Sequence, residues 1–336
     1  MMEQMRNRGF SWLVVLSVLI VMAFVISMNS GSIHLSLLDV GKTLFGGGTA
    51  KQHLILFHFR LPRIMLSILV GAGLAVSGCM LQGLTRNALA DPGILGINAG
   101  AGFMVMIFIS FLSASALTPL LLLPLMAIAG AAFAAVLIYL LAYRREQGLL
   151  PTRLILTGVA IAAGLSSATL VMSLRLKPEK YQFVATWFVG NIWGTNWTFV
   201  AVLLPWIVIL LPYALYKAKV LDVFQLGEQT AKSLGLDVNR ERIKLLAAAV
   251  ALSGASVAIG GGIVFVGMIG PHLARQLVGP RHRLLLPGSA LIGALLLIAA
   301  DTIGRLVIPN MEIPTGIVVA VIGAPYFLYL LAKAKA

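Results

Sequence analysis

The chain has 336 residues, of which 60% are hydrophobic and 11% are charged. A soluble domain carries about 25% charged residues, so this composition excludes a protein whose surface is solvated by water alone. Lysine and arginine outnumber aspartate and glutamate by 25 to 11. Because basic residues collect in the cytoplasmic loops of membrane proteins, the excess requires no nucleic-acid partner. The single cysteine, Cys79, excludes an intramolecular disulfide.

The first apolar segment follows Arg6 and Arg8 and covers residues 10–28. It is longer than the apolar core of a signal peptide, and no small-x-small cleavage site precedes the polar residues 29–32. We therefore predict that this segment is retained as the first transmembrane helix.

Similar apolar segments recur along the chain, and a helix needs roughly 20 apolar residues to cross a bilayer. The predicted spans cover residues 10–28, 63–82, 93–112, 117–142, 154–174, 197–216, 243–261, 263–273, 284–303 and 314–332. The segment 263–273 is too short to cross as a helix, so we expect a half-span or the continuation of a broken helix. The sequence thus predicts an all-α integral membrane protein of about ten transmembrane helices in one domain, residues 1–336.

The orientation of these spans follows from the basic residues. Most lysines and arginines fall at the chain ends and in alternate loops, and such loops face the cytoplasm. This distribution predicts an even number of spans with both termini in the cytoplasm.

Two connecting segments are unusually long. The outer segment 29–61 alternates apolar and polar residues, which is typical of a short helix on the membrane surface. The inner segment 217–242 mixes acidic and basic residues with leucine and alanine. We interpret it as the place where a soluble partner docks.

Tryptophans and small residues each form a pattern. Trp187, Trp193 and Trp197 precede the sixth span and predict an interfacial belt, with a ligand cage as the alternative. Small residues at residues 71–78 and 260–270 predict close helix packing. The alternative is that these small residues line a transport pathway.

The sequence shows no catalytic chemistry. Gly41-Lys42-Thr43 is not a phosphate loop, because Ser36 stands where the first glycine belongs and the segment is predicted to lie outside the cell. The five histidines lack partners at ligand spacing, and no nucleophile and base can be paired. We therefore predict a chain without enzyme activity, metal or cofactor. The middles of the spans hold few carboxylates, which argues against an ion-coupled secondary transporter.

Two arginines lie where the second span is predicted to begin. Pro62 can take a first-turn position, which would place Arg60 and Arg63 at the outer mouth. Both side chains would then either snorkel to lipid headgroups or bind carboxylates of an extracellular partner. Arg305 has the same alternatives, and Asp301, one turn earlier, is placed to pair with it.

Five stretches resemble signatures of the iron-siderophore and cobalamin (FecCD-type) permease family of bacterial ABC importers. They are residues 60–63 (RLPR), 82–92 (QGLTRNALADP), 265–275 (FVGMIGPHLAR), 282–287 (HRLLLP) and 312–316 (EIPTG). The resemblance implies a type II importer permease, paired with a second copy or a homologue. It also implies two separate ATPase subunits below and a substrate-binding protein outside.

The resemblance also implies site residues. Arg60, Arg63 and Arg305 match arginines that meet glutamates of the binding protein. The coupling segment, which contacts the ATPase, matches Leu226, Gly227, Glu228, Ala231, Leu234 and Gly235. A cytoplasmic gate matches Pro151 and Thr152. Relatives carry two small hydroxyl residues at the gate, so Pro151 is a departure that would stiffen it.

We therefore expect the permease subunit of an ATP-driven importer for ferric siderophores, acting by alternating access. Siderophores are chosen because they dominate the family, so cobalamin and haem remain alternatives within it. The alternatives from other classes are a carrier driven by an ion gradient and an intramembrane enzyme. The sequence shows neither the buried ionisable groups that such a carrier needs nor the nucleophile and base that such an enzyme needs.

Overall fold

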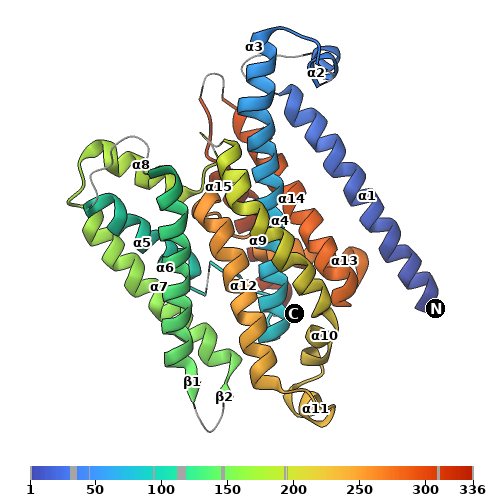
Figure 1. Cartoon of the computed structure of the whole chain (residues 1–336). Helices are drawn as coiled ribbons and strands as arrows, with labels where there is room; N and C mark the ends of the chain where they lie inside the picture. The colour runs from blue at the N-terminus through green and yellow to red at the C-terminus, as the bar shows by residue number, and fades with distance from the viewer. Residues whose placement is uncertain are drawn as a thin grey trace.

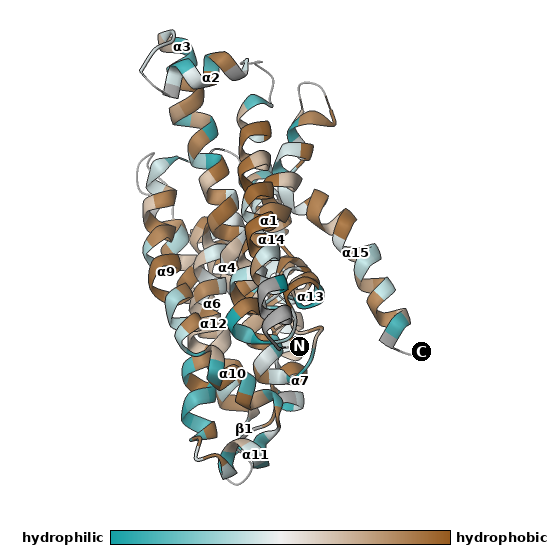
Figure 2. Cartoon of the chain, turned by 90° about the vertical axis from the view of Figure 1, so that its right-hand side faces the viewer, coloured by the Kyte–Doolittle hydropathy of each residue, from teal (hydrophilic) through white to brown (hydrophobic). Residues whose placement is uncertain are grey.

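The chain folds into a bundle of helices that run between two ends (Figure 1). The computed structural model describes residues 2–30, 36–44, 46–93, 95–111, 119–144, 148–192, 194, 196–308 and 311–334. The end that we name the α2 end holds α2 (Leu37–Leu44), α3 (Ala50–His53) and α8 (Pro178–Val189). The opposite end, the α11 end, holds α10 (Ala218–Gln225), α11 (Glu228–Ser233), β1 (Tyr143–Arg144) and β2 (Gly148–Leu149). Hydrophilic residues gather around α10 and α11, whereas the ribbon between the ends is mostly hydrophobic (Figure 2).

Helices occupy the predicted spans. They are α1 (Met2–Asn29), α4 (Leu61–Thr85), α5 (Ile97–Phe111), α6 (Pro119–Ala142), α7 (Pro151–Ser173), α9 (Trp197–Tyr216), α12 (Val238–Gly260), α13 (Val266–Val278), α14 (His282–Leu306) and α15 (Thr315–Ala334). Within the described residues, 8 helices are long and apolar enough to cross a membrane, and α5 is a shorter apolar helix. Helix α13 has 13 residues, about 20 Å, which confirms that the eighth segment is too short to cross as a helix. The chain is thus an all-α, multi-pass membrane protein.

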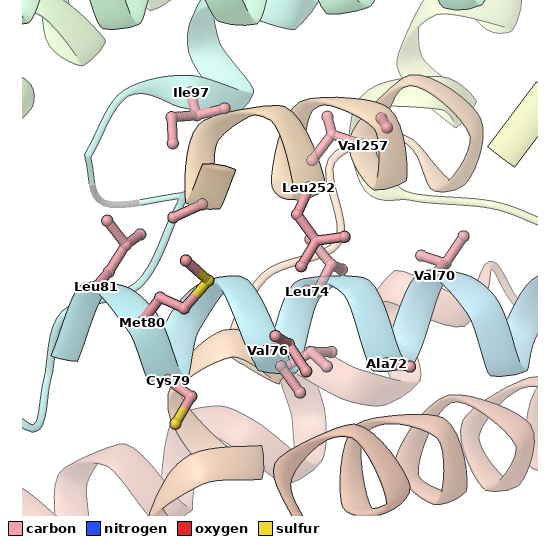
Figure 3. Close-up of a cluster of buried hydrophobic side chains, with 14 of the residues drawn as sticks. Val70, Ala72, Leu74, Val76, Cys79, Met80, Leu81, Ile97, Leu252 and Val257 are labelled. Atoms are coloured by element: carbon pink, nitrogen blue, oxygen red, sulfur yellow. The ribbon is translucent and has the colours of Figure 1, made fainter. Parts of the chain in front are cut away.

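Helix α4 forms the centre of the bundle and is buried along most of its length. Its apolar side chain Leu74 lies beside Leu252 of α12 (Figure 3). A Cβ atom added at Gly71 would collide with the carbonyl oxygen of Gly293. Small residues therefore let helix backbones touch, which confirms the packing interpretation of residues 71–78.

The second span begins earlier than predicted. Residues 29–61 were expected to form a loop with one short helix, and α2 is such a helix. However, α3 and the π-helix η1 (Leu54–Arg60) continue directly into α4. The Thr49 side chain accepts a hydrogen bond from the Gln52 N–H, and Gln52 accepts one from the Thr49 N–H, so a capping box starts this long helix.

Pro62 therefore lies inside a continuous helix and does not begin one. A proline within an α-helix removes a hydrogen bond and clashes with the carbonyl group four residues earlier. The wider π-turn before Pro62 relieves this conflict, because Leu61 donates its N–H to the Leu56 carbonyl oxygen, five residues back. Pro62 thus has the expected first-turn position in α4, but the helical backbone begins earlier, at Ala50.

The predicted tryptophan belt is wrong for Trp187. Its ring is buried and packs edge-on against Phe188, with 5.5 Å between the ring centroids. Gly262 donates its N–H to the Trp187 carbonyl oxygen over 3.1 Å, so this part of α8 is drawn into the bundle. Trp197 is exposed at the start of α9 and donates its indole N–H to the Phe57 carbonyl oxygen over 2.7 Å. Trp193 lies outside the described residues.

Candidate functional site

A cluster of charged side chains lies at the α2 end, which we name the arginine cluster. It comprises Arg60, Arg63, Asp301, Arg305 and Glu312. Arg63 Nε lies 2.8 Å from Asp301 Oδ1, and Arg63 Nη1 lies 2.8 Å from Glu312 Oε2. Arg305 Nε lies 3.1 Å from Asp301 Oδ2. Helix α4, helix α14 and the segment before α15 thus meet through ion pairs.

Burial differs sharply between the two carboxylates. The Asp301 side chain is 1% exposed and lies between two guanidinium groups, whereas the Glu312 side chain is 44% exposed. Burying a carboxylate is costly unless opposite charges and hydrogen bonds offset its lost hydration. Asp301 has both, because Thr315 also donates to Oδ1 over 3.4 Å. The predicted Asp301–Arg305 pair is confirmed, and Arg63 joins it from a distant part of the chain.

Arg60 and Arg305 also hold the end of α1. Arg60 Nη1 donates to the Met28 carbonyl oxygen. Arg305 Nη1 donates to the Ser30 carbonyl oxygen over 2.8 Å, and its Nη2 donates to Ser27 Oγ over 2.6 Å. The last carbonyl groups of a helix lack partners within the helix and attract cations. These two arginines therefore tie α1 to α4 and α14.

The structure thus brings all three arginines of the docking prediction together at one end. Two of them direct donors to the end of α1, and Arg63 holds an exposed carboxylate. Contact with a binding protein stays a prediction. No role was predicted for Glu312, although the signature stretch 312–316 contains it.

The predicted coupling segment forms α11 and its flanking turns at the α11 end. Leu226 and Leu234 are 62% and 63% exposed on either side of this helix, while Ala231 is buried. Gly227 and Gly235 have φ angles of 105° and 81°. Glycine adopts such positive angles readily because it has no Cβ atom. Leu236 donates its N–H to the Ala231 carbonyl oxygen over 3.0 Å and so closes the helix end.

One ion pair ties α11 to α12. Arg242 Nη2 donates to Glu228 Oε2 over 3.1 Å, and the Arg242 side chain is largely buried. Burial would raise the pKa of the Glu228 carboxyl, but hydrogen bonds and charge from Lys232 and Arg242 outweigh it and lower that pKa. Glu228 is therefore ionised at neutral pH.

A second pair ties α10 to the first turn of α14. Asp222 Oδ1 lies 2.7 Å from His282 Nδ1 and accepts the His282 backbone N–H over 2.9 Å. Burial would raise the pKa of the Asp222 carboxyl, yet these hydrogen bonds lower it. An anion at a helix start satisfies a free N–H and complements the helix dipole. The signature stretch 282–287 contains His282, but sequence alone did not pair it with Asp222.

The predicted gate residues lie at the start of α7. Pro151 takes a first-turn position there, where a proline costs no hydrogen bond, and Leu150 precedes it at the N-cap position. Thr152 is exposed. Narrowing of a pathway at these residues stays a prediction.

An apolar cavity of about 390 Å³ lies among α6, α9 and α12. Its lining includes Ala131, Ala135, Trp206, Ala247 and Val250, and none of the arginine-cluster residues. A polar ligand would lose its hydration there without gaining hydrogen bonds. This cavity therefore does not suit a hydrophilic chelate.

Comparison with known proteins relates the chain to transport permeases. Two curated relatives are the iron(3+)-hydroxamate import system permease protein FhuG of Bacillus subtilis (strain 168) and the Fe(3+) dicitrate transport system permease protein FecD of Escherichia coli (strain K12). FhuG is 48% identical over 99% of this chain and 100% of its own length, and FecD is 39% identical over 85% and 87%. A solved metal-chelate type ABC transporter in an inward-facing conformation matches with a TM-score of 0.84 and 31% identity, over 96% of this chain and 98% of that one. Residues 19–333 match the FecCD transport family, and the chain belongs to that family.

Proposed function

We propose that this chain is the membrane permease subunit of an ATP-driven importer that carries a ferric hydroxamate or a related iron chelate into the cell. The similarity to the hydroxamate import permease carries the proposal, because 48% identity extends over 99% of this chain and 100% of the relative. Because the alignment covers nearly the whole chain, it includes the spans, the coupling segment and the arginine cluster. The permease performs no covalent chemistry, and a separate ATPase subunit supplies the energy.

We place the α11 end in the cytoplasm. Basic residues concentrate there, including Lys219, Arg240, Lys244, Arg281 and Arg283, and basic loops stay on the cytoplasmic side. Both termini then lie in the cytoplasm, and the α2 end faces outward. The ATPase contacts α11 through the exposed leucines, and a substrate-binding protein docks on the arginine cluster. A second permease subunit completes the translocation path.

Uptake of radioactive iron tests this function. Cells that lack the chain and cells in which it is restored receive iron as a ferric hydroxamate, as ferric citrate or as haem. We expect deletion to abolish uptake from the hydroxamate, and restoration to recover it. A chain restored beside a hydrolysis-deficient ATPase subunit is expected to give no uptake, because alternating access then lacks its energy source.

Two results would contradict the proposal. If deletion abolishes uptake from citrate or haem alone, the proposed substrate is wrong, but the chain is still an importer permease. Uptake that continues with the hydrolysis-deficient ATPase, but stops when an ionophore collapses the proton gradient, would identify a secondary transporter.

A further inference from the structure

Arg63 presents two different edges to its surroundings. A guanidinium group is a planar fork whose N–H donors point in fixed directions. Its Nε donates to buried Asp301, and its Nη1 donates to exposed Glu312, each over 2.8 Å. The Arg63 side chain itself is 11% exposed. One edge is therefore fixed inside the protein, and the other reaches a carboxylate at the surface.

Asp301 acts as the positioning residue for this guanidinium group. It is buried, it accepts from Arg63 on one oxygen, and its other oxygen faces Arg305 Nε. An aspartate held between two cations has little freedom to move. Asp301 therefore fixes the direction of Arg63 whether or not Glu312 is bound.

Charge within this trio favours a second anion. Arg63 and Arg305 carry two positive charges, and Asp301 offsets one of them. The remaining charge attracts a carboxylate to the outer edge of Arg63, and a guanidinium group binds carboxylates well because the two shapes match. Glu312 supplies that carboxylate from within the chain.

The Glu312 contact is weak enough to exchange. Glu312 lies before α15 in a segment without helical structure, and its neighbour Ile313 donates to the Gly304 carbonyl oxygen over 2.9 Å. That backbone bond holds the segment in place without the Glu312 side chain. An ion pair with one exposed partner is weak because water screens it, so another carboxylate can replace Glu312 and leave no charge buried alone.

We propose that the outer edge of Arg63 is a carboxylate-exchange site, in which Glu312 is the internal occupant and an acidic side chain of the docking partner takes its place. This inference rests on the proposed function, which supplies a substrate-binding protein as the partner. Glu312 then lowers the affinity of docking and favours release after each delivery.

The test measures the dissociation constant of the substrate-binding protein for the full importer in lipid nanodiscs. Glu312→Gln removes the competing charge, and we expect binding to become about twofold to fivefold tighter, as loss of one exposed ion pair allows. The gain should shrink at high salt, since exposed charges are then screened. Glu179→Gln, which changes an exposed glutamate of α8 at the same end, is the matched control and should leave binding unchanged.

Unchanged or weaker binding by Glu312→Gln would overturn the exchange site. Arg63→Gln separates that failure from failure of the docking proposal: unchanged affinity in this variant would reject docking on Arg63 altogether. Arg63→Lys keeps the charge but lacks the fork, so it should bind the partner more weakly than the native chain and still fold. If Arg63→Gln weakens docking while Glu312→Gln has no effect, docking stands and only the exchange is rejected.

Discussion

The two ends of helix α14 are tied to the molecule in different ways. The helix has 25 residues, which correspond to about 37 Å. At the α2 end, Asp301 is buried between arginines of α4 and of α14 itself. At the α11 end, His282 is paired with Asp222, whose side chain is 40% exposed on the short helix α10. One end is therefore held by a buried carboxylate, whereas the other is held by a carboxylate that is partly exposed.

This difference matches the work that each end is proposed to do. A docking surface needs side chains that are fixed before the partner arrives. A coupling segment has to follow the motion of an ATPase, and segments with few buried contacts open or shift at low free-energy cost. A substitution at one end of the molecule can therefore be compared with the unchanged opposite end.

Asp301→Asn should cause the largest loss of stability. It removes the negative charge between two buried guanidinium groups, and breaking a buried ion pair costs about 3 kcal/mol or more. The free energy of unfolding of the purified permease in detergent, measured with increasing denaturant, checks this value. Glu312→Gln is the control and should stay within about 1 kcal/mol of the native chain, because its partner remains bound to Asp301. Equal, small losses in both variants would show that burial does not distinguish the two carboxylates.

Asp222→Asn should cause a smaller and more local loss. It weakens two hydrogen bonds to His282 and removes the charge at the start of α14, which together cost about 1–2 kcal/mol. Trypsin cleavage after Lys232, in the coupling segment, should become about 5 to 30 times faster. Cleavage at that site should stay at the native rate in Asp301→Asn if the two ends are independent. Faster cleavage in both variants would mean that α14 transmits the disturbance along its length.

Leu234→Asp should change stability least, by about 0.5 kcal/mol at most, because the side chain is exposed. It should nevertheless prevent the binding protein from stimulating ATP hydrolysis in the assembled importer, since a charge cannot fit an apolar contact with the ATPase. Leu38→Asp, at an exposed leucine of α2, places the same charge at the opposite end and should leave stimulation intact. Normal stimulation in Leu234→Asp would remove α11 from the coupling site.

Local signals in the sequence explain which parts of the fold were predictable. Each apolar segment marked a helix, because a helix satisfies its own backbone hydrogen bonds wherever lipid surrounds it. The start at Ala50 could also be read from the sequence, since Thr49 and Gln52 have the spacing of a capping box. Trp187 was wrongly predicted to lie at the membrane interface, because tryptophan rings favour that position. Its burial depends on Gly262 and other residues far along the chain.

The candidate site divides in the same way. The family resemblance predicted roles for the three arginines and the coupling segment, which stay predictions. The four-residue spacing predicted the Asp301–Arg305 pair, which the structure contains. The partners of Arg63, Arg242 and His282 were not readable, since each contact joins separate helices.

By itself, the sequence determined that the chain crosses a membrane many times, where nearly every span lies, and that it belongs with chelate permeases. Hydrophobicity and short motifs are local properties, so they can be read from the sequence without a structure. Only the tertiary structure decided which charges meet between different helices, because a side chain at the end of one helix finds its partner through the packing of all the others. That packing buries Asp301 and exposes Glu312 on the same arginine, and this contrast is what gives Arg63 one fixed edge and one exchangeable edge.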